Sequence, residues 1–201
     1  MTSDPVVHTI QTALPHCLAG GLIIGVGICA GWWEARRPGR WTVRSVGWWV
    51  DHLVRPLLGS RSWPRRTSVI AANNISVCAL MTATGALGPA AWVGVAGVGF
   101  SLGIGLRLLL ASAQTPATDS RPPSGRQRMA SWIGIALNML EPPAILLAAG
   151  LALSQGALSP TIALADAWGT FVKVVLPLLV VAAAGEALWM GARQADVRLL
   201  L

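Results

Sequence analysis

The stretch LNMLEPPAILLAAGLAL, residues 137–153, decides the class of this protein. It lies inside the apolar run 130–154, and about 20 apolar residues are enough to cross a bilayer as a helix. Glu141 stands near the middle of that run. A charge at the bilayer centre costs roughly 2.5–3.5 kcal/mol on insertion scales, and acids at this depth usually face a protein interior or a wet cavity. We therefore expect a membrane protein with its polar chemistry buried inside a helix bundle.

Four more apolar runs of similar length accompany this stretch. They are 13–33, 67–87, 89–112 and 169–191. Of the 201 residues, 54% are hydrophobic and 11% are charged, whereas soluble domains carry about 25% charged residues. The sequence thus predicts an all-α membrane bundle of about five spans, which forms a single membrane domain over 1–201.

Arginine is concentrated in alternate loops. The loop 34–66 holds eight arginines, and the third loop and the tail hold Arg121, Arg126, Arg128, Arg193 and Arg198. The N-terminal leader, the turn 88–89 and the loop 156–168 hold none. Because cytoplasmic loops are enriched in Lys and Arg, we expect the N-terminus outside and the C-terminus inside.

The loop 34–66 contains an amphipathic segment. Apolar residues recur at helical spacing at Val43, Val46, Val50, Leu53, Val54 and Leu57, and polar ones face the other way at Arg44, Asp51, His52 and Arg55. Four tryptophans in the same loop suit the headgroup layer. The pattern predicts a helix on the cytoplasmic membrane surface. The alternative is a packed cytoplasmic connector.

Small residues form stripes on the predicted helices. The first span carries Gly21/Gly25 and Gly27/Gly31, and the third carries Gly99/Gly103 and Gly97/Ser101/Gly105. Such stripes let helix backbones approach closely. They predict tight helix packing, either within one chain or between copies.

A set of polar residues lies inside the predicted spans. They are Asn73, Asn74, Arg107, Asn138, Glu141 and Glu186. With a rise of about 1.5 Å per residue, all fall in the cytoplasmic half, and Glu141 is the deepest at about 16 Å. Arg107 and Glu186 reach similar depths and are expected to form an ion pair, which would offset part of each burial cost. Alternatively, Arg107 extends to the headgroups.

Glu141 has no basic residue at its own level and is followed by Pro142-Pro143. Neither proline has an amide hydrogen, so the carbonyls of Asn138 and Met139 lose their helical partners. A broken helix at membrane depth is tolerated only in a protein interior or along a wet cavity. Glu141 has three readings: it hydrogen-bonds Asn73 or Asn74 and pins helices together, it acts chemically, or it serves ligand or proton passage.

Motifs for other chemistry are missing from the sequence. The three cysteines lie in apolar segments without a CxxC pair, and no HExxH, phosphate loop or Ser-His-acid spacing occurs. We expect neither a metal nor a cofactor. A nucleic-acid partner is not expected either, because the arginines fill loops between apolar runs instead of a solvated face.

Three segments together resemble one family of membrane proteins. The first is AANNISVCALMTATGALG (71–88), with a glycine-rich span after it; the second is the opening stretch around Glu141; the third is VVLPLLVVAAAGEALW (174–189), with its late Glu186. In order and spacing they resemble the stage II sporulation protein M family of five-span proteins. The family's His-Gly before the acid is Leu137-Asn138 here, so a role that needs that histidine does not carry over.

The resemblance implies several roles in the cytoplasmic membrane of a bacterium. Family members act as scaffolds for cell-wall remodelling during sporulation, accompany ABC transporter components, or belong to machinery for circular bacteriocin peptides. We expect a scaffold or permease-like subunit of an envelope or peptide maturation and export complex, with lipid around it and further copies, other membrane subunits or an ABC ATPase as partners.

Two other functions stay open at this point. One is a membrane-embedded enzyme that removes a leader from a hydrophobic peptide or joins its ends, with Glu141 as acid and base and with Asn73, Asn74 and Asn138 orienting the peptide carbonyl. The other is a proton-coupled passage through Glu141 and Glu186, which would require an oligomer because five spans are few for a transporter.

Overall fold

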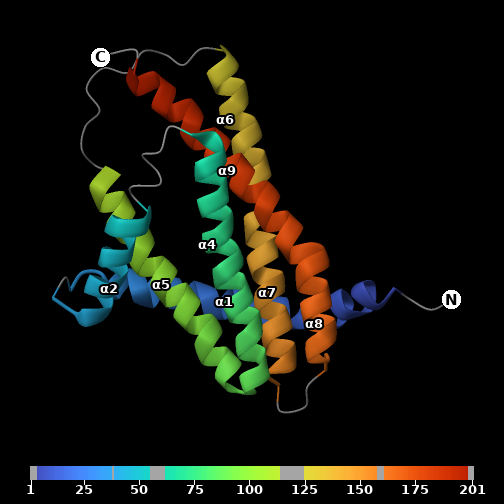
Figure 1. Cartoon of the computed structure of the whole chain (residues 1–201). Coiled ribbons are helices and arrows are strands. Elements are labelled where there is room, and N and C mark those ends of the chain that lie inside the picture. Colours follow the sequence, from blue (N-terminus) through green and yellow to red (C-terminus); the bar gives the residue numbers. More distant parts are fainter. Residues whose placement is uncertain (1–3, 38, 55–61, 114–124, 158–160, 199–201) are drawn as a thin grey trace.

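The computed structural model describes residues 4–37, 39–54, 62–113, 125–157 and 161–198, and these contain helices and turns but no strand. The long helices are α1 (Pro5–Glu34), α4 (Trp63–Thr84), α5 (Ala90–Ala113), α6 (Gly125–Asn138), α7 (Glu141–Gln155) and α9 (Leu176–Arg198). Shorter elements are α2 (Trp41–Trp49), η1 (Val50–Val54), η2 (Gly85–Leu87), α8 (Leu164–Thr170) and η3 (Phe171–Val175). Figure 1 shows their arrangement, with α1 crossing the other long helices.

Five helical segments are long and apolar enough to cross a membrane. They are Pro5–Glu34, Trp63–Leu87, Ala90–Leu108, Arg128–Gln155 and Leu164–Gly191. The fourth joins α6 to α7, and the fifth joins α8, η3 and α9. Each contains or overlaps one of the five apolar runs, so the prediction of five long apolar helices is confirmed.

The outer surface of the bundle is apolar. On α1, the residues Leu14, Leu18, Leu22 and Val26 recur every fourth position and are all exposed, Leu18 by 75%. Residues four apart share one helix face, so this is a continuous apolar stripe with no protein over it. A soluble monomer rarely leaves such a stripe in water, and its exposure agrees with a lipid-facing helix.

The closest helix crossing joins α1 to α5. Gly99 lies against Ile24, and Gly103 lies against Ile28. The two helices therefore pass the contact in the same direction. A Cβ at Gly27 would lie 2.7 Å from the Ala96 carbonyl oxygen, and a Cβ at Gly31 would collide with the Phe100 carbonyl. The predicted close packing is therefore confirmed for the stripes Gly27/Gly31 and Gly99/Gly103, within one chain. It is not found for the other two stripes, because a Cβ at Gly25 or Gly97 would meet nothing within 4 Å.

The centre of the bundle is the second half of α7. Ala148, Ala149, Leu151, Ala152 and Leu153 have no exposed surface. A helix that is apolar on all sides belongs in a protein core or in a membrane, and here α1, α4 and α9 pack around it. This position fixes the start of α7, and with it Glu141, between α4 and α9.

The segment after α1 is only partly the predicted surface helix. In α2 and η1, Val43 and Val50 are buried, while Trp41 and Trp48 are exposed. α2 packs on α5, where a Cβ at Gly105 would lie 4.0 Å from a Val46 methyl group. The described part of this segment thus packs on α5 with one face, as the alternative of a packed connector predicts. Arg55 and Leu57 lie outside the described residues.

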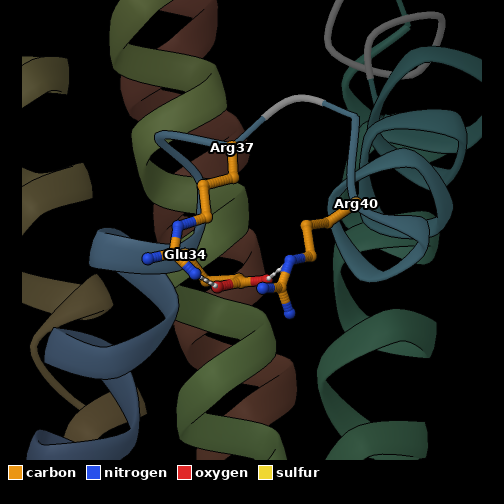
Figure 2. Close-up of polar contacts among 3 residues, drawn as sticks. All are labelled: Glu34, Arg37 and Arg40. Carbon is orange, nitrogen blue, oxygen red and sulfur yellow. Dashed lines mark ion pairs between the residues drawn. The ribbon is translucent and has the colours of Figure 1, made fainter.

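The end of α1 is tied to this connector by charge. The Glu34 carboxylate lies 3.9 Å from Nη1 of Arg37 and 3.5 Å from Nε of Arg40 (Figure 2). Trp33, next to Glu34, has the Arg36 guanidinium 4.4 Å from its ring centroid. These contacts group the arginines that follow α1 around the end of the helix.

Candidate functional site

The fourth span is interrupted at Met139 and Leu140. α6 ends at Asn138 and α7 begins at Glu141, and the Leu140 amide turns back to the Leu137 carbonyl. The two prolines explain the new start, because the first turn of a helix needs no amide hydrogen from its own residues. The same prolines leave the carbonyls of Asn138 and Met139 without their helical donors. The predicted break is therefore present.

A short chain of hydrogen bonds ties α4 to this break. The Asn74 Nδ2 group donates to Oε1 of Glu141 at 3.0 Å, and the Asn73 Nδ2 group donates to Oδ1 of Asn74 at 3.1 Å. These side chains are half-buried. The hydrogen bond between Glu141 and an asparagine of α4, one of the three readings of Glu141, is thus observed.

Glu186 on α9 lies near Glu141. The two carboxyl groups are close enough to interact electrostatically. A Cβ at Gly185 would lie 3.0 Å from the Asn138 amide nitrogen, which places the end of α6 directly beside Glu186 on α9. Neither glutamate forms an ion pair within the described part of the chain. Asn73, Asn74, Asn138, Glu141 and Glu186 are called the Glu141 cluster below.

One polar atom of the Glu141 cluster has no partner. Oδ1 of Asn138 is buried and accepts no hydrogen bond from any residue described. An unsatisfied buried acceptor costs about 1–3 kcal/mol, and native proteins rarely leave one without a reason. Asn138 also carries one of the two backbone carbonyls that the prolines leave without a helical donor, so this residue has two acceptors to offer.

Cys78 also belongs to this region, although the sequence analysis gave no role to the three cysteines. It lies one turn beyond Asn74 on α4, is 1% exposed, and interacts electrostatically with Glu141. The sequence does indicate this position, because Cys78 follows Asn74 by four residues and residues four apart share a helix face. Buried cysteines in apolar surroundings are inert, so Cys78 contributes packing here.

Arg107 is not part of the Glu141 cluster, and the predicted ion pair with Glu186 is wrong. Nη1 of Arg107 donates to the Trp32 carbonyl at 3.5 Å, and the guanidinium lies 5.5 Å from the Trp32 ring centroid. The physical reason is that α5 packs along α1, so Arg107 faces the end of α1. The predicted pair rested on the similar depths of Arg107 and Glu186 in the membrane. Depth alone does not tell which neighbour a side chain faces.

The sequence reading also missed Arg66, which it placed in a loop. Arg66 belongs to the first turns of α4 and is only 6% exposed. Its guanidinium lies against α9, because a Cβ at Gly191 would lie 3.4 Å from Nη2 of Arg66. Its spacing of seven from Asn73, two helical turns, was the signal that α4 presents both residues to one side.

The chemistry open to the Glu141 cluster is narrow. Among the residues described, no three His, Cys, Asp or Glu side chains come together as a metal site. Two surface hollows of about 530 and 550 Å³ lie elsewhere, one between α1 and α5 and one at the turn 85–89 beside Gln155, and neither is lined by the cluster. The cluster is therefore suited to joining helices, or to holding a proton, by hydrogen bonding.

The residues that resemble the stage II sporulation protein M family all fall in the described helices. Asn73 and Asn74 are on α4, Glu141 begins α7, and Glu186 is on α9. The membership itself stays a prediction from those residues. No family model matches the chain, and no curated protein or solved structure matches it either.

Proposed function

We propose that the chain is a non-catalytic membrane component, a scaffold or permease-like subunit of a bacterial envelope or peptide maturation and export complex. The observation that carries the proposal is the hydrogen bond from Asn74 to Glu141. This hydrogen bond gives Glu141 a structural role, because it joins α4 to α7 where the fourth span is broken. A polar bond between helices is an ordinary means of helix association in a membrane.

Two further features support this function. The cluster lies away from the two surface hollows, whereas small-molecule sites are usually concave. The exposed apolar side chains on α1, α5 and α6 offer broad surfaces to lipid or to membrane subunits. The resemblance to the sporulation protein M family points to the same class of partner.

We further propose that the N-terminus lies outside the cytoplasmic membrane and the C-terminus inside. The arginines that follow α1 and begin α4 support this orientation, since Lys and Arg are enriched on the cytoplasmic side. A cytoplasmic ATPase or a similar partner would then meet this arginine-rich end. Cysteines introduced singly into the turn 88–89 and the loop 34–66 test the orientation by labelling from outside intact cells.

The central experiment is purification of the tagged protein from its native host in mild detergent, followed by native mass spectrometry. A stoichiometric ATPase, permease or wall enzyme is the expected result. The matched test is Glu141→Gln, which keeps an acceptor for Asn74 and should retain that partner. Loss of the partner's function in a folded Glu141→Gln protein would contradict a purely structural Glu141.

A second candidate is an embedded enzyme that matures a hydrophobic peptide, and one observation favours it. Oδ1 of Asn138 accepts no hydrogen bond from a described residue, and the carboxyl groups of Glu141 and Glu186 are close enough to interact with each other. In this function Glu141 is the acid and base, and Asn138 orients a peptide amide. The purified chain in nanodiscs must change the mass of its cognate peptide without any other protein, and an unchanged mass would exclude this candidate.

A further inference from the structure

Arg66 is a buried cation, and two of its side-chain nitrogens lack a partner among the described residues. Its residue is 6% exposed, and neither Nε nor Nη1 has a hydrogen-bond partner in the chain as described. A guanidinium keeps its charge in every protein environment. Burying such a charge is strongly unfavourable unless it is paired, so the position of Arg66 calls for an anion.

The surroundings of Arg66 add further donors. Oγ1 of the adjacent Thr67 is also buried and has no partner among the described groups. Both residues stand at the N-terminal end of the 22-residue helix α4, whose first turn carries no acidic residue and whose N-cap, Ser62, makes no capping hydrogen bond. The start of a helix bears a partial positive charge and attracts anions. The start of the helix therefore adds a positive potential to the charge of Arg66, and the Thr67 hydroxyl is able to donate to an anion.

The nearest glutamate does not supply the missing anion. Glu186 lies five residues before Gly191 on α9, about 7.5 Å along the helix axis, and Gly191 is the residue on which the Arg66 guanidinium rests. No ion pair joins Arg66 to Glu186. Gly191 has no side chain, which leaves the guanidinium fork room beside α9.

We propose that Arg66 and Thr67, near the start of α4, bind a phosphate group, and that the headgroup of an anionic phospholipid supplies it. The planar guanidinium matches phosphate with two parallel hydrogen bonds. The site lies one turn inside the start of the span Trp63–Leu87, and the exposed Trp63 marks the headgroup level. Basic pockets between membrane helices are known to hold anionic lipid headgroups.

The test uses the full chain, purified in detergent, stripped of lipid and titrated with three probes. The probes are phosphatidylglycerol, phosphatidylcholine and inorganic phosphate, and native mass spectrometry measures bound lipid. We compare Arg66→Gln with Arg65→Gln, because Arg65 is the exposed neighbour and its loss removes the same charge. Arg66→Gln should weaken phosphatidylglycerol binding about tenfold or more, the scale of a lost charge-assisted hydrogen bond. Arg65→Gln should change it less than about threefold, as a surface charge does.

The other probes identify the source of the phosphate. Preference for phosphatidylglycerol, with no competition from millimolar inorganic phosphate, supports the lipid. Saturable binding of inorganic phosphate that displaces the lipid and depends on Arg66 would keep the phosphate site but overturn the lipid as its source. Equal phosphatidylglycerol binding by the wild type and Arg66→Gln would overturn the whole proposal.

A second pair of variants covers the case in which Arg66→Gln does not fold. Arg66→Lys keeps the charge but loses the planar fork, and Thr67→Val removes the hydroxyl at nearly constant volume. Each should fold and bind phosphatidylglycerol more weakly than the wild type. Unchanged binding in both variants would show that neither the fork nor the hydroxyl holds a phosphate.

Discussion

The α1–α5 crossing and the Glu141 cluster join helices by opposite means. At the crossing, backbone touches backbone: Gly27 and Gly31 of α1 meet main-chain atoms of Phe100, and Gly99 and Gly103 of α5 meet those of Ile24 and Ile28. At the cluster, the helices are joined through side-chain amides and a carboxyl group. Lipid tails are as apolar as leucine, so hydrophobicity does not hold helices together in a bilayer, and packing and polar bonds must do so. One bundle therefore uses both backbone contact and side-chain hydrogen bonds. Substitutions should weaken the first by steric overlap and the second by loss of a hydrogen bond.

The largest effect is expected at the crossing, from Gly31→Ala. The new methyl group would overlap the Phe100 carbonyl, and backbone cannot rotate away as a side chain can. Overpacking of this kind costs about 3 kcal/mol, so unfolding in detergent should begin at clearly lower temperature or denaturant concentration. Gly25→Ala on the same helix is the matched control, because a Cβ there meets nothing within 4 Å. Equal loss of stability in both variants would show that close approach is not what holds α1 to α5.

A smaller effect is expected in the cluster, from a double-mutant cycle on Asn74→Ala and Glu141→Ala. The two side chains share one hydrogen bond of 3.0 Å, and such bonds between membrane helices contribute about 1 kcal/mol. The coupling energy, measured by unfolding of the single and double variants, should be of this size. A cycle between Cys29 and Glu141, which have no contact, is the control and should show additivity. A coupling of zero at Asn74 would remove the structural role of Glu141.

Variants of Arg107 test whether this residue is coupled to the α1–α5 crossing or to the Glu141 cluster. Its contact with the Trp32 ring assigns it to the crossing, so a cycle with Trp32→Leu should give a coupling of about 0.5 kcal/mol, typical of a cation–π pair at a partly exposed site. A cycle between Arg107→Gln and Glu186→Gln should give none. The reverse result would restore the ion pair between Arg107 and Glu186 and place Arg107 in the cluster.

Much of the fold follows from local sequence properties. Length and apolarity alone predict five spanning helices, and the missing amide hydrogens of Pro142 and Pro143 predict the break before Glu141. Glycine spacing also predicts the close packing at Gly27/Gly31 and Gly99/Gly103, although the same spacing at Gly21/Gly25 leaves Gly25 without a neighbour. Each of these properties is carried by the residues themselves, whatever their neighbours in space.

What the sequence could not give is the rotation of each helix about its axis. A rise of 1.5 Å per residue fixes depth, and it put Arg107 level with Glu186, but α5 turns Arg107 toward Trp32. Arg66 was missed for a related reason, because arginines near a span normally read as loop charges. Only the packing of α4 on α9 shows that this one is buried.

The smallest effect is expected from Glu141→Gln, and it separates structure from chemistry. Glutamine keeps a side-chain oxygen in the place of Oε1, so Asn74 still has an acceptor, and the free energy of unfolding should change by less than about 0.5 kcal/mol. Glu141→Leu has no acceptor, leaves the Asn74 amide unpaired, and should cost about 1–3 kcal/mol. The ratio of the two losses measures how much of the role of Glu141 is hydrogen bonding. If Glu141→Gln is as stable as the wild type and yet inactive in the cell, the carboxyl group itself is required. The cluster is then a reaction or proton site and not only a contact that joins helices.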